Sequence, residues 1–520
     1  MAQSNFAARR LKETTMNAYK VTWTASLTVA LSALVACGGG GGNPGTCQGS
    51  ALVCQPNSGG SQAAASTPSQ TGSGNSTSTQ SNGSSESLAN ICTRTGEQQF
   101  ARSYLNETYL WYREIPNASP SQFSTVQDYF YALLTPALDS SGARKDRFSF
   151  IASVADADSL ATGANVGYGA DWVRDSAGRL RVTQVAPGSP AAIAGLARGG
   201  EAVSLISGNG NLYPNAPGAS ITLRYRATPA SPERAVTLNA APLVDDPVPQ
   251  SQVFTTPNGQ LVGYVLFNAH TRGAQDKLID TLRGMATAGL STMVLDLRYN
   301  GGGFIYTALS LATMLSSPSN ENKVFERLQF SDKRAQDTAE SAFLYTGALQ
   351  FGETRYPANF ALPRLGLPRV YVLTTDNTCS ASESVINGLR GVDVEVVLVG
   401  KATCGKPYGF SRKDNCGLAY YPIEFQGTYA KGFGDYANGM AATCQVADDL
   451  DNPLGSVNEG LLSAALRHVD TGSCPPVASA ADPLNASARS HASGTAKPNS
   501  LGLPHATRPQ MPGRVLTPRR

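Results

Sequence analysis

The chain has 520 residues, of which 41 are Lys or Arg and 38 are Asp or Glu, so its formal net charge is +3. The stretch after Cys474 carries +5, which leaves about −2 for the rest of the chain. No basic module points to nucleic-acid binding, and no Cys-x-x-Cys or His-x-x-x-His spacing indicates a metal site. We therefore expect no nucleic-acid partner, no metal and no cofactor.

The first 37 residues resemble the export signal of a bacterial lipoprotein. Residues 21–36 form an apolar run after Lys20 that is short for a membrane span. The run ends in Leu34-Val35-Ala36-Cys37, which is similar to a lipobox, and Gly38 in place of aspartate favours the outer membrane. We expect a protein of the bacterial cell envelope, anchored to outer-membrane lipid through Cys37 and facing the periplasm. The alternative is ordinary signal cleavage that leaves Cys37 as a thiol.

Composition separates a folded middle from two ends. Residues 38–87 are dominated by Gly, Ser, Thr, Gln and Asn, which bury too little apolar surface to offset chain entropy. This segment is predicted to be a disordered tether. Residues 475–520 are rich in Pro, Ala and Ser and are predicted to be a disordered basic tail. The nearly 390 residues between them suffice for two or three domains.

The nine cysteines suit an exported protein. Lipidation of Cys37 leaves eight, an even number that predicts disulfides. We predict a bond between Cys404 and Cys416, which bracket Lys406, while Cys47 and Cys54 can close a loop in the tether. The sequence leaves open the pairing of the other four, which are Cys92, Cys379, Cys444 and Cys474.

Residues 88–152 show the spacing of amphipathic helices. A small helical N-terminal domain is predicted, and its apolar residues are interpreted as core: Phe100, Tyr104, Leu105, Tyr109, Leu110, Tyr112, Val126, Tyr129, Phe130, Leu133 and Leu134.

Residues 153–247 change to short alternating strands with glycine turns. The order of Val166-Gly167-Tyr168-Gly169-Ala170, a strand, and Pro187-Gly188-Ser189-Pro190 resembles a PDZ domain. That resemblance implies that Gly167, Tyr168 and Gly169 bind the C-terminal carboxylate of a peptide. Gly199-Gly200-Glu201 departs from the Gly-Asp usual in such domains. A small β-domain that only packs is the alternative.

Residues 248–474 have the pattern of an α/β domain. Apolar runs at 261–267, 292–297, 370–373 and 394–399 are predicted to be buried strands, and helical runs separate them. This alternation favours a parallel sheet. The active groups are then expected at the strand ends.

Two short motifs carry the chemistry. Ser380 lies in Thr-Cys-Ser-Ala-Ser-Glu before a predicted helix, and Lys406 follows 26 residues later in Cys-Gly-Lys-Pro. Together they offer a nucleophile and a base. Three glycines, 301–303, follow a buried strand and can expose backbone N–H groups, as an oxyanion hole requires. The N–H of Ala381 is a second expected donor.

From about residue 90 to 470 the chain resembles the C-terminal processing, or tail-specific, serine peptidases. The resemblance rests on Leu-Asp-Leu-Arg-x-Asn-Gly-Gly-Gly, Ser-Ala-Ser-Glu and Gly-Lys, with the helical segment and the PDZ-like module before them. It implies a catalytic domain of the crotonase and Clp-protease type, into which the PDZ-like domain is inserted, and polypeptide substrates taken by their C-termini. It also implies site roles for five residues: Ser380 as nucleophile, Lys406 as general base, and Gly302, Gly303 and Ala381 as oxyanion donors.

Two features depart from that family, and one demand follows for the lysine. Phe410 stands where many relatives have a glutamine, and the interval from Ser380 to Lys406 is one residue longer than usual. A lysine acts as a base near pH 7 only if burial lowers its pKa by about 3 units. We therefore predict that Lys406 Nζ lies in a mostly apolar niche beside Ser380 Oγ. Glu383 and Asp393 are interpreted as helix-face or solvated carboxylates, and the alternative is that one of them orients the lysine amine.

Three alternatives to the Ser/Lys peptidase stay open. Of the four histidines only His270 follows a strand of the catalytic domain, while His468 falls in a predicted terminal helix, residues 459–469. A His270-assisted serine hydrolase is therefore one. The missing glutamine favours a catalytically inert PDZ-type peptide-binding lipoprotein. An esterase with the same dyad is the third. The sequence does not determine the oligomeric state.

Overall fold

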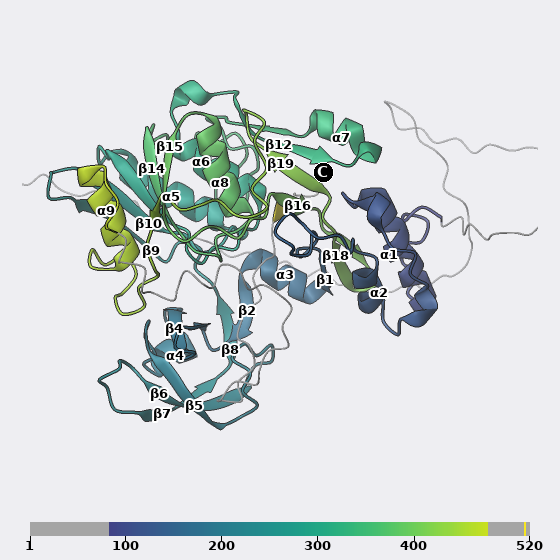
Figure 1. Ribbon diagram of the computed structural model, residues 1–520, viewed down its shortest axis with the longest axis horizontal. Helices are drawn as coiled ribbons and strands as arrows, with labels where there is room; N and C mark the ends of the chain where they lie inside the picture. The colour runs from purple at the N-terminus through teal and green to yellow at the C-terminus, as the bar shows by residue number, and fades with distance from the viewer. Residues whose placement is uncertain (1–82, 477–513, 516–520) are drawn as a thin grey trace, which may run out of the picture. The chain divides into compact units, whose positions relative to one another are not determined.

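The computed structural model describes residues 83–476 and the two residues Arg514–Val515 (Figure 1). The predicted signal with Cys37, the tether with Cys47 and Cys54, and nearly all of the basic tail lie outside the described residues. None of the helices in the described part is long and apolar enough to cross a membrane.

The N-terminal helices are present, but they do not form a separate bundle. The helix α1 (Arg94–Thr108) begins after Thr93, whose hydroxyl accepts a hydrogen bond from the Gly96 N–H. The helix α2 (Val126–Ala132) begins in the same way after Thr125. Their buried aromatic side chains share one core with β18 (Leu418–Tyr421) and Phe410. The end of the predicted helical segment is a strand instead, β1 (Phe150–Ser153), which pairs antiparallel with β18.

The middle segment is an antiparallel sheet with a core of its own. It follows the helix α3 (Val154–Thr162). Its strand order is β3-β4-β5-β6-β7, and β2 pairs separately with β8. Between residues 164 and 244 the only helix is α4 (Pro190–Ile193), a single turn. The strands of this segment are β2 (Ala164–Gly167), β3 (Ala170–Arg174), β4 (Leu180–Val185), β5 (Glu201–Ser207), β6 (Ser220–Arg226), β7 (Arg234–Asn239) and β8 (Ala241–Val244).

A six-stranded sheet in the order β20-β15-β14-β11-β10-β9 forms the centre of the segment 248–474. All neighbouring strands are parallel except β9, which is antiparallel to β10. The four predicted strands are therefore confirmed, with their parallel pairing. The strands are β9 (Gln250–Thr255), β10 (Leu261–Leu266), β11 (Thr292–Asp296), β14 (Arg369–Thr374), β15 (Glu395–Gly400) and β20 (Cys444–Gln445).

Helices cover both faces of this sheet, which explains why its strands are apolar throughout (Figure 1). One face, with Val265 and Leu295, packs against α5 (Ala274–Ala286), α6 (Ile305–Leu315) and α8 (Ala381–Gly391). The other face, with Tyr264 and Val294, packs against α9 (Gly460–Thr471). The predicted terminal helix, 459–469, is thus observed with Glu459 as its N-cap.

Two smaller sheets stand beside the central one. The first has the order β13-β12-β19-β16-β21, and the second β1-β18-β17. In the first, the C-terminal strand β21 pairs parallel with β16. The remaining strands and a short helix are β12 (Val324–Phe330), α7 (Ala335–Glu340), β13 (Ala342–Leu344), β16 (Tyr408–Phe410), β17 (Lys413–Asn415), β19 (Phe425–Thr428) and β21 (Arg514–Val515).

The predicted disulfide between Cys404 and Cys416 is wrong. Cys404 bonds to Cys379, and Cys416 bonds to Cys92. The chain between Cys404 and Cys416 forms the strands β16 and β17, and extended chain of this length carries the two sulfur atoms beyond the reach of a disulfide.

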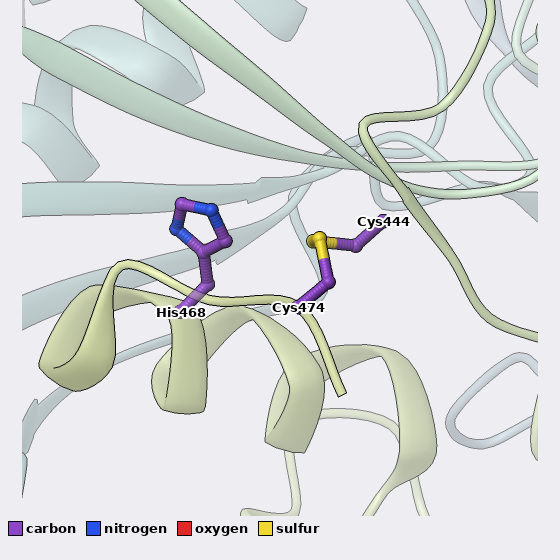
Figure 2. Close-up of side chains that lie close together, drawn as sticks. All are labelled: Cys444, His468 and Cys474. Atoms are coloured by element: carbon purple, nitrogen blue, oxygen red, sulfur yellow. A yellow bond between two sulfur atoms is a disulfide. The ribbon is translucent and has the colours of Figure 1, made fainter. Parts of the chain in front are cut away.

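A third disulfide joins Cys444 to Cys474 and fastens the end of α9 to the edge of the central sheet. His468 lies beside it in Figure 2 and shares a hydrogen bond of 3.0 Å between its Nδ1 and the Tyr371 hydroxyl. The sulfur atoms of Cys444 and Cys474 are bonded to each other and are therefore not available as metal ligands beside His468.

Candidate active site

Ser380 lies in the turn between β14 and α8, in a backbone conformation that is unusual for a side-chain-bearing residue. Its φ is 60° and its ψ is −114°, and such strain is commonly kept only where function requires it. The residue is buried, and its Oγ has no hydrogen-bond partner among the described residues. The hydroxyl therefore does not serve as an ordinary helix cap.

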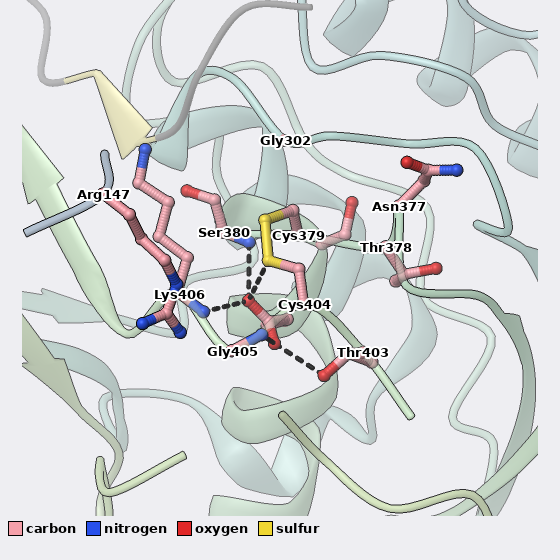
Figure 3. Close-up of a disulfide and its surroundings, with 12 residues drawn as sticks. Arg147, Gly302, Asn377, Thr378, Cys379, Ser380, Thr403, Cys404, Gly405 and Lys406 are labelled. Atoms are coloured by element: carbon pink, nitrogen blue, oxygen red, sulfur yellow. Dashed lines mark hydrogen bonds between the residues drawn. A yellow bond between two sulfur atoms is a disulfide. The ribbon is translucent and has the colours of Figure 1, made fainter. Parts of the chain in front are cut away.

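Glu383 joins the turn that holds Ser380, the serine turn, to the loop that holds Lys406, the lysine loop (residues 401–407). One of its oxygens, Oε2, accepts the N–H of Ser380 and the N–H of Lys406, both at 2.8 Å. The other, Oε1, accepts the N–H of Gly405 at 2.9 Å and the hydroxyl of Thr403 at 2.6 Å (Figure 3). Burial raises the pKa of this carboxyl, while its four donors act in the opposite direction.

The interpretation of Glu383 as a solvated or helix-face carboxylate is therefore wrong. The side chain is fully buried. A signal was present in the sequence, since a glutamate three residues after a serine at a helix start is the pattern of a capping box. Asp393, by contrast, is paired with Lys431 in an exposed position, as expected for a solvated carboxylate.

Lys406 lies in an apolar niche, as predicted. Its side chain is 1% exposed. Its Nζ lies 4.5 Å from the centroid of the Phe410 ring and 5.0 Å from that of the Phe148 ring. Figure 3 shows the side chains of Ser380 and Lys406 reaching to the same side of the Cys379–Cys404 disulfide.

Asn300, which the sequence analysis left without a role, holds the glycine loop against the serine turn. Its backbone carbonyl accepts the N–H of Cys379 at 3.1 Å and the hydroxyl of Ser382 at 3.0 Å. Its side-chain Oδ1 accepts the N–H of Gly302 at 3.0 Å. The available signal was a polar residue directly before three glycines at the end of a buried strand.

Gly302 passes so close to Ser380 that no other residue fits. Its φ is 102°, and a Cβ on it would lie 2.9 Å from Ser380 Cβ and 3.0 Å from Ala381 N. The sequence predicted that the Gly302 N–H donates to an oxyanion. In the structure this N–H donates to Asn300 Oδ1 instead, so it is not available for that role. The N–H groups of Gly303 and Ala381 make no hydrogen bond within the described part of the chain.

His270 also borders this loop. Its backbone N–H donates to Gly302 O at 3.0 Å, and its Nδ1 lies 3.1 Å from Asn300 Oδ1. Burial lowers the pKa of His270 to about 3, although its hydrogen bonds favour the charged form. The imidazole is therefore neutral near pH 7. Within residues 83–476 its Nε2 is buried without a partner.

Two family models match the chain. Residues 261–414 match the model of peptidase family S41, and residues 96–150 match that of the peptidase S41 N-terminal domain. The chain belongs to peptidase family S41. Membership implies a serine-type peptidase that acts on polypeptides, and it confirms the resemblance seen in the sequence.

Three solved structures are similar to the chain. A protein of Bacteroides fragilis described as an S41 protease is 28% identical, with a TM-score of 0.57, and the match covers 72% of this chain and 97% of that one. The photosystem II D1 C-terminal processing protease is 17% identical, with a TM-score of 0.44, over 69% of this chain and 94% of its own. Mature CPAF in complex with lactacystin is 11% identical, with a TM-score of 0.40, and the match covers 72% of this chain and 97% of that one. No curated protein sequence matches the chain.

In this S41 peptidase the predicted carboxylate loop lies between β2 and β3, in the antiparallel module. The carbonyls of Tyr168 and Gly169 accept the N–H groups of Ala191 and Ala186, each at 2.8 Å. Their own N–H groups donate to none of the described residues. The loop thus has free donors, and its role with Gly167 stays a prediction.

Proposed function

We propose that this S41 peptidase cleaves polypeptides with a Ser380/Lys406 dyad. The observation that carries the proposal is the shared carboxylate oxygen, Glu383 Oε2, which binds the backbone N–H groups of both residues. A single rigid acceptor thereby brings the two loops together at the end of the parallel sheet. The strained, unpartnered Ser380 hydroxyl and the buried Lys406 amine support the same assignment.

The niche around Lys406 is the apolar surrounding that a lysine needs to act as a general base. A lysine in water is neutral in roughly one molecule in 2,500 at pH 7. Full burial disfavours the ammonium form by several kcal/mol, whereas a ring face favours the cation by about 0.5–2 kcal/mol. Phe410, at the position where many relatives have glutamine, and Phe148 therefore supply mainly desolvation.

The reaction then follows from this arrangement. Neutral Lys406 takes the hydroxyl proton as Ser380 Oγ attacks the carbonyl carbon. The N–H groups of Ala381 and Gly303 stabilise the negative oxygen that forms. Protonated Lys406 gives its proton to the departing amine. Lys406, neutral again, then deprotonates a water molecule, which attacks the acyl-enzyme and releases the acyl group.

The antiparallel module is the part of the protein to which we assign substrate recognition. We assign recognition of polypeptide C-termini to the free N–H groups in the loop of Gly167, Tyr168 and Gly169, in a module that resembles a PDZ domain. We also retain the expectations of a catalytic domain of the crotonase and Clp-protease type and of an outer-membrane lipid anchor on Cys37.

A His270-assisted hydrolase is the second candidate. The neutral imidazole and its unpartnered Nε2 favour it, because a base needs a free lone pair. Against it, no hydrogen bond joins His270 to Ser380 among the described residues, where the partner of Nδ1 is the amide of Asn300.

The test compares four variants of the full chain on an unfolded protein and on a peptide with an apolar C-terminus. Ser380→Ala and Lys406→Ala are each expected to lower kcat/KM by at least about 10³-fold. His270→Ala and the control Lys401→Ala, an exposed lysine in the same loop, are expected to retain cleavage. Loss in His270→Ala with activity in Lys406→Ala would establish the second candidate. Binding without cleavage by the wild type would establish the inert peptide-binding protein.

A further inference from the structure

The Cys379–Cys404 disulfide lies between the two halves of the proposed dyad. Cys379 directly precedes Ser380, and Cys404 is two residues before Lys406. The two Cα atoms are 5.2 Å apart. Figure 3 shows the bond between the serine turn and the lysine loop, and the sulfur of Cys404 lies 3.5 Å from Glu383 Oε2. Both cysteines are partly exposed, so a soluble reductant can reach them.

Hydrogen bonds and one disulfide hold the lysine loop in place. Residues 401–407 lie between β15 and β16 and belong to neither a helix nor a strand. The loop bonds to Glu383, and the N–H of Cys404 donates to Thr378 O at 3.0 Å. It also bonds to Thr374 through Lys401, to Met440 through Thr403 and to Gly427 through Pro407. Water can replace each of these bonds, whereas the disulfide is the covalent link between the two loops.

We propose that Cys379 and Cys404 are positioning residues, whose disulfide sets the distance between Ser380 Oγ and Lys406 Nζ. This inference rests on the proposed dyad. Reduction removes the covalent tie between the two loops, so that only hydrogen bonds then hold Ser380 and Lys406 at their separation. Displacements near 1 Å in an active site can slow a reaction about 10²-fold.

The chemistry of the change is a thiol–disulfide exchange with an added dithiol. One thiolate of the dithiol attacks a cysteine sulfur and forms a mixed disulfide, and the second thiolate closes the cyclic disulfide. The protein gains two electrons and two protons and ends with two thiols, and the dithiol is oxidised. Such an enzyme would work in an oxidising compartment and be slow in a reducing one.

The chain offers a matched control, because the Cys444–Cys474 disulfide has a similar sequence separation, 30 against 25. The full chain is compared as wild type, as Cys379→Ser/Cys404→Ser and as Cys444→Ser/Cys474→Ser. The readouts are kcat and KM on a peptide, the rate at which a fluorophosphonate labels Ser380, and the thermal midpoint.

We expect Cys379→Ser/Cys404→Ser to lower kcat and the labelling rate by about 10- to 100-fold, with KM within twofold of the wild type. The control pair is expected to stay within twofold in both rates, whatever its thermal midpoint. Wild-type kcat and labelling in a folded Cys379→Ser/Cys404→Ser protein would overturn the inference. Equal losses in both pairs would overturn it too, because they would indicate a general loss of stability.

A reversible experiment covers the case in which the double variant fails to fold. Cys444→Ser/Cys474→Ser is reduced with dithiothreitol until mass spectrometry finds free thiols at both Cys379 and Cys404 while Cys92–Cys416 is still bonded, and is then reoxidised. Labelling is expected to fall and then return, and labelling unchanged by reduction would refute the idea. The dyad itself is judged separately, since it fails only if Ser380→Ala or Lys406→Ala keeps its activity.

Discussion

At the scale of single residues, the site depends on buried polar side chains that form hydrogen bonds mainly with backbone groups. Glu383 accepts four hydrogen bonds and Asn300 binds both the serine turn and the glycine loop. The sequence indicated the proposed reacting residues, Ser380 and Lys406, because their types carry the chemistry. Its signals for the two supports, a capping-box spacing at Glu383 and a polar residue before the glycines at Asn300, are weak, because a Glu or Asn is far more often solvated.

The lowered pKa of His270 predicts how the free energy of unfolding varies with pH. Its pKa of about 3 in the folded protein lies below the value of about 6.5 in an unfolded chain. As the pH falls below 6.5 the unfolded state therefore binds the proton first, and the free energy of unfolding falls by up to about 1.4 kcal/mol per pH unit until pH 3. The groups that face the ring are neutral: Asn300, Phe267 and the Gly302 carbonyl.

The measurement is urea unfolding of wild type and His270→Gln at pH 7, 6 and 5. The difference between the two proteins should shrink as the pH falls, because only the wild type contains the group that must take up this proton. A difference that stays constant over this range would show that His270 is not held neutral.

At the scale of helices and strands, the sequence predicted best where burial is regular. The strands β10, β11, β14 and β15 and the helix α9 appear within a few residues of their predicted positions. The segment 88–152 was less well predicted, because its apolar side chains pack onto β18 from the far end of the chain. Helical spacing reports a buried face and does not say which partner buries it.

The disulfide between Cys92 and Cys416 ties α1 to the turn between β17 and β18 across 324 residues. In the chain-entropy account a bond that closes a longer loop stabilises more. We expect Cys92→Ser/Cys416→Ser to lose about 2 kcal/mol more unfolding free energy than Cys444→Ser/Cys474→Ser, which opens a separation of 30. Urea unfolding of both pairs tests this. Equal losses would indicate that the segment before α1 stays docked without the bond.

At the scale of the whole molecule, Arg298 joins three parts of the chain. It is fully buried and donates to Asp296 at the end of β11, to Glu459 at the start of α9 and to Asp448. Asp448 also accepts a hydrogen bond from Arg198 of the antiparallel module, at 2.8 Å. The catalytic sheet, its terminal helix and the module thus meet on one buried network.

Removal of this guanidinium should destabilise the protein strongly. Arg298→Met leaves buried carboxylates without their cation, and the expected loss is about 3–5 kcal/mol in urea unfolding. The control Arg355→Met removes an exposed partner of Asp280 and should cost less than about 1 kcal/mol. Comparable small losses in both variants would show that the carboxylates are neutralised or hydrated instead.

The sequence by itself determined the parallel α/β sheet and the serine, lysine and glycine motifs of the S41 family. These features are local, because periodic burial and reactive side chains are written in neighbouring residues. Only the tertiary structure decided that Cys404 bonds to Cys379, that Glu383 is buried and that Phe148 covers the lysine. Those contacts join segments that are distant along the chain, and their distances depend on how loops meet at the edges of packed sheets.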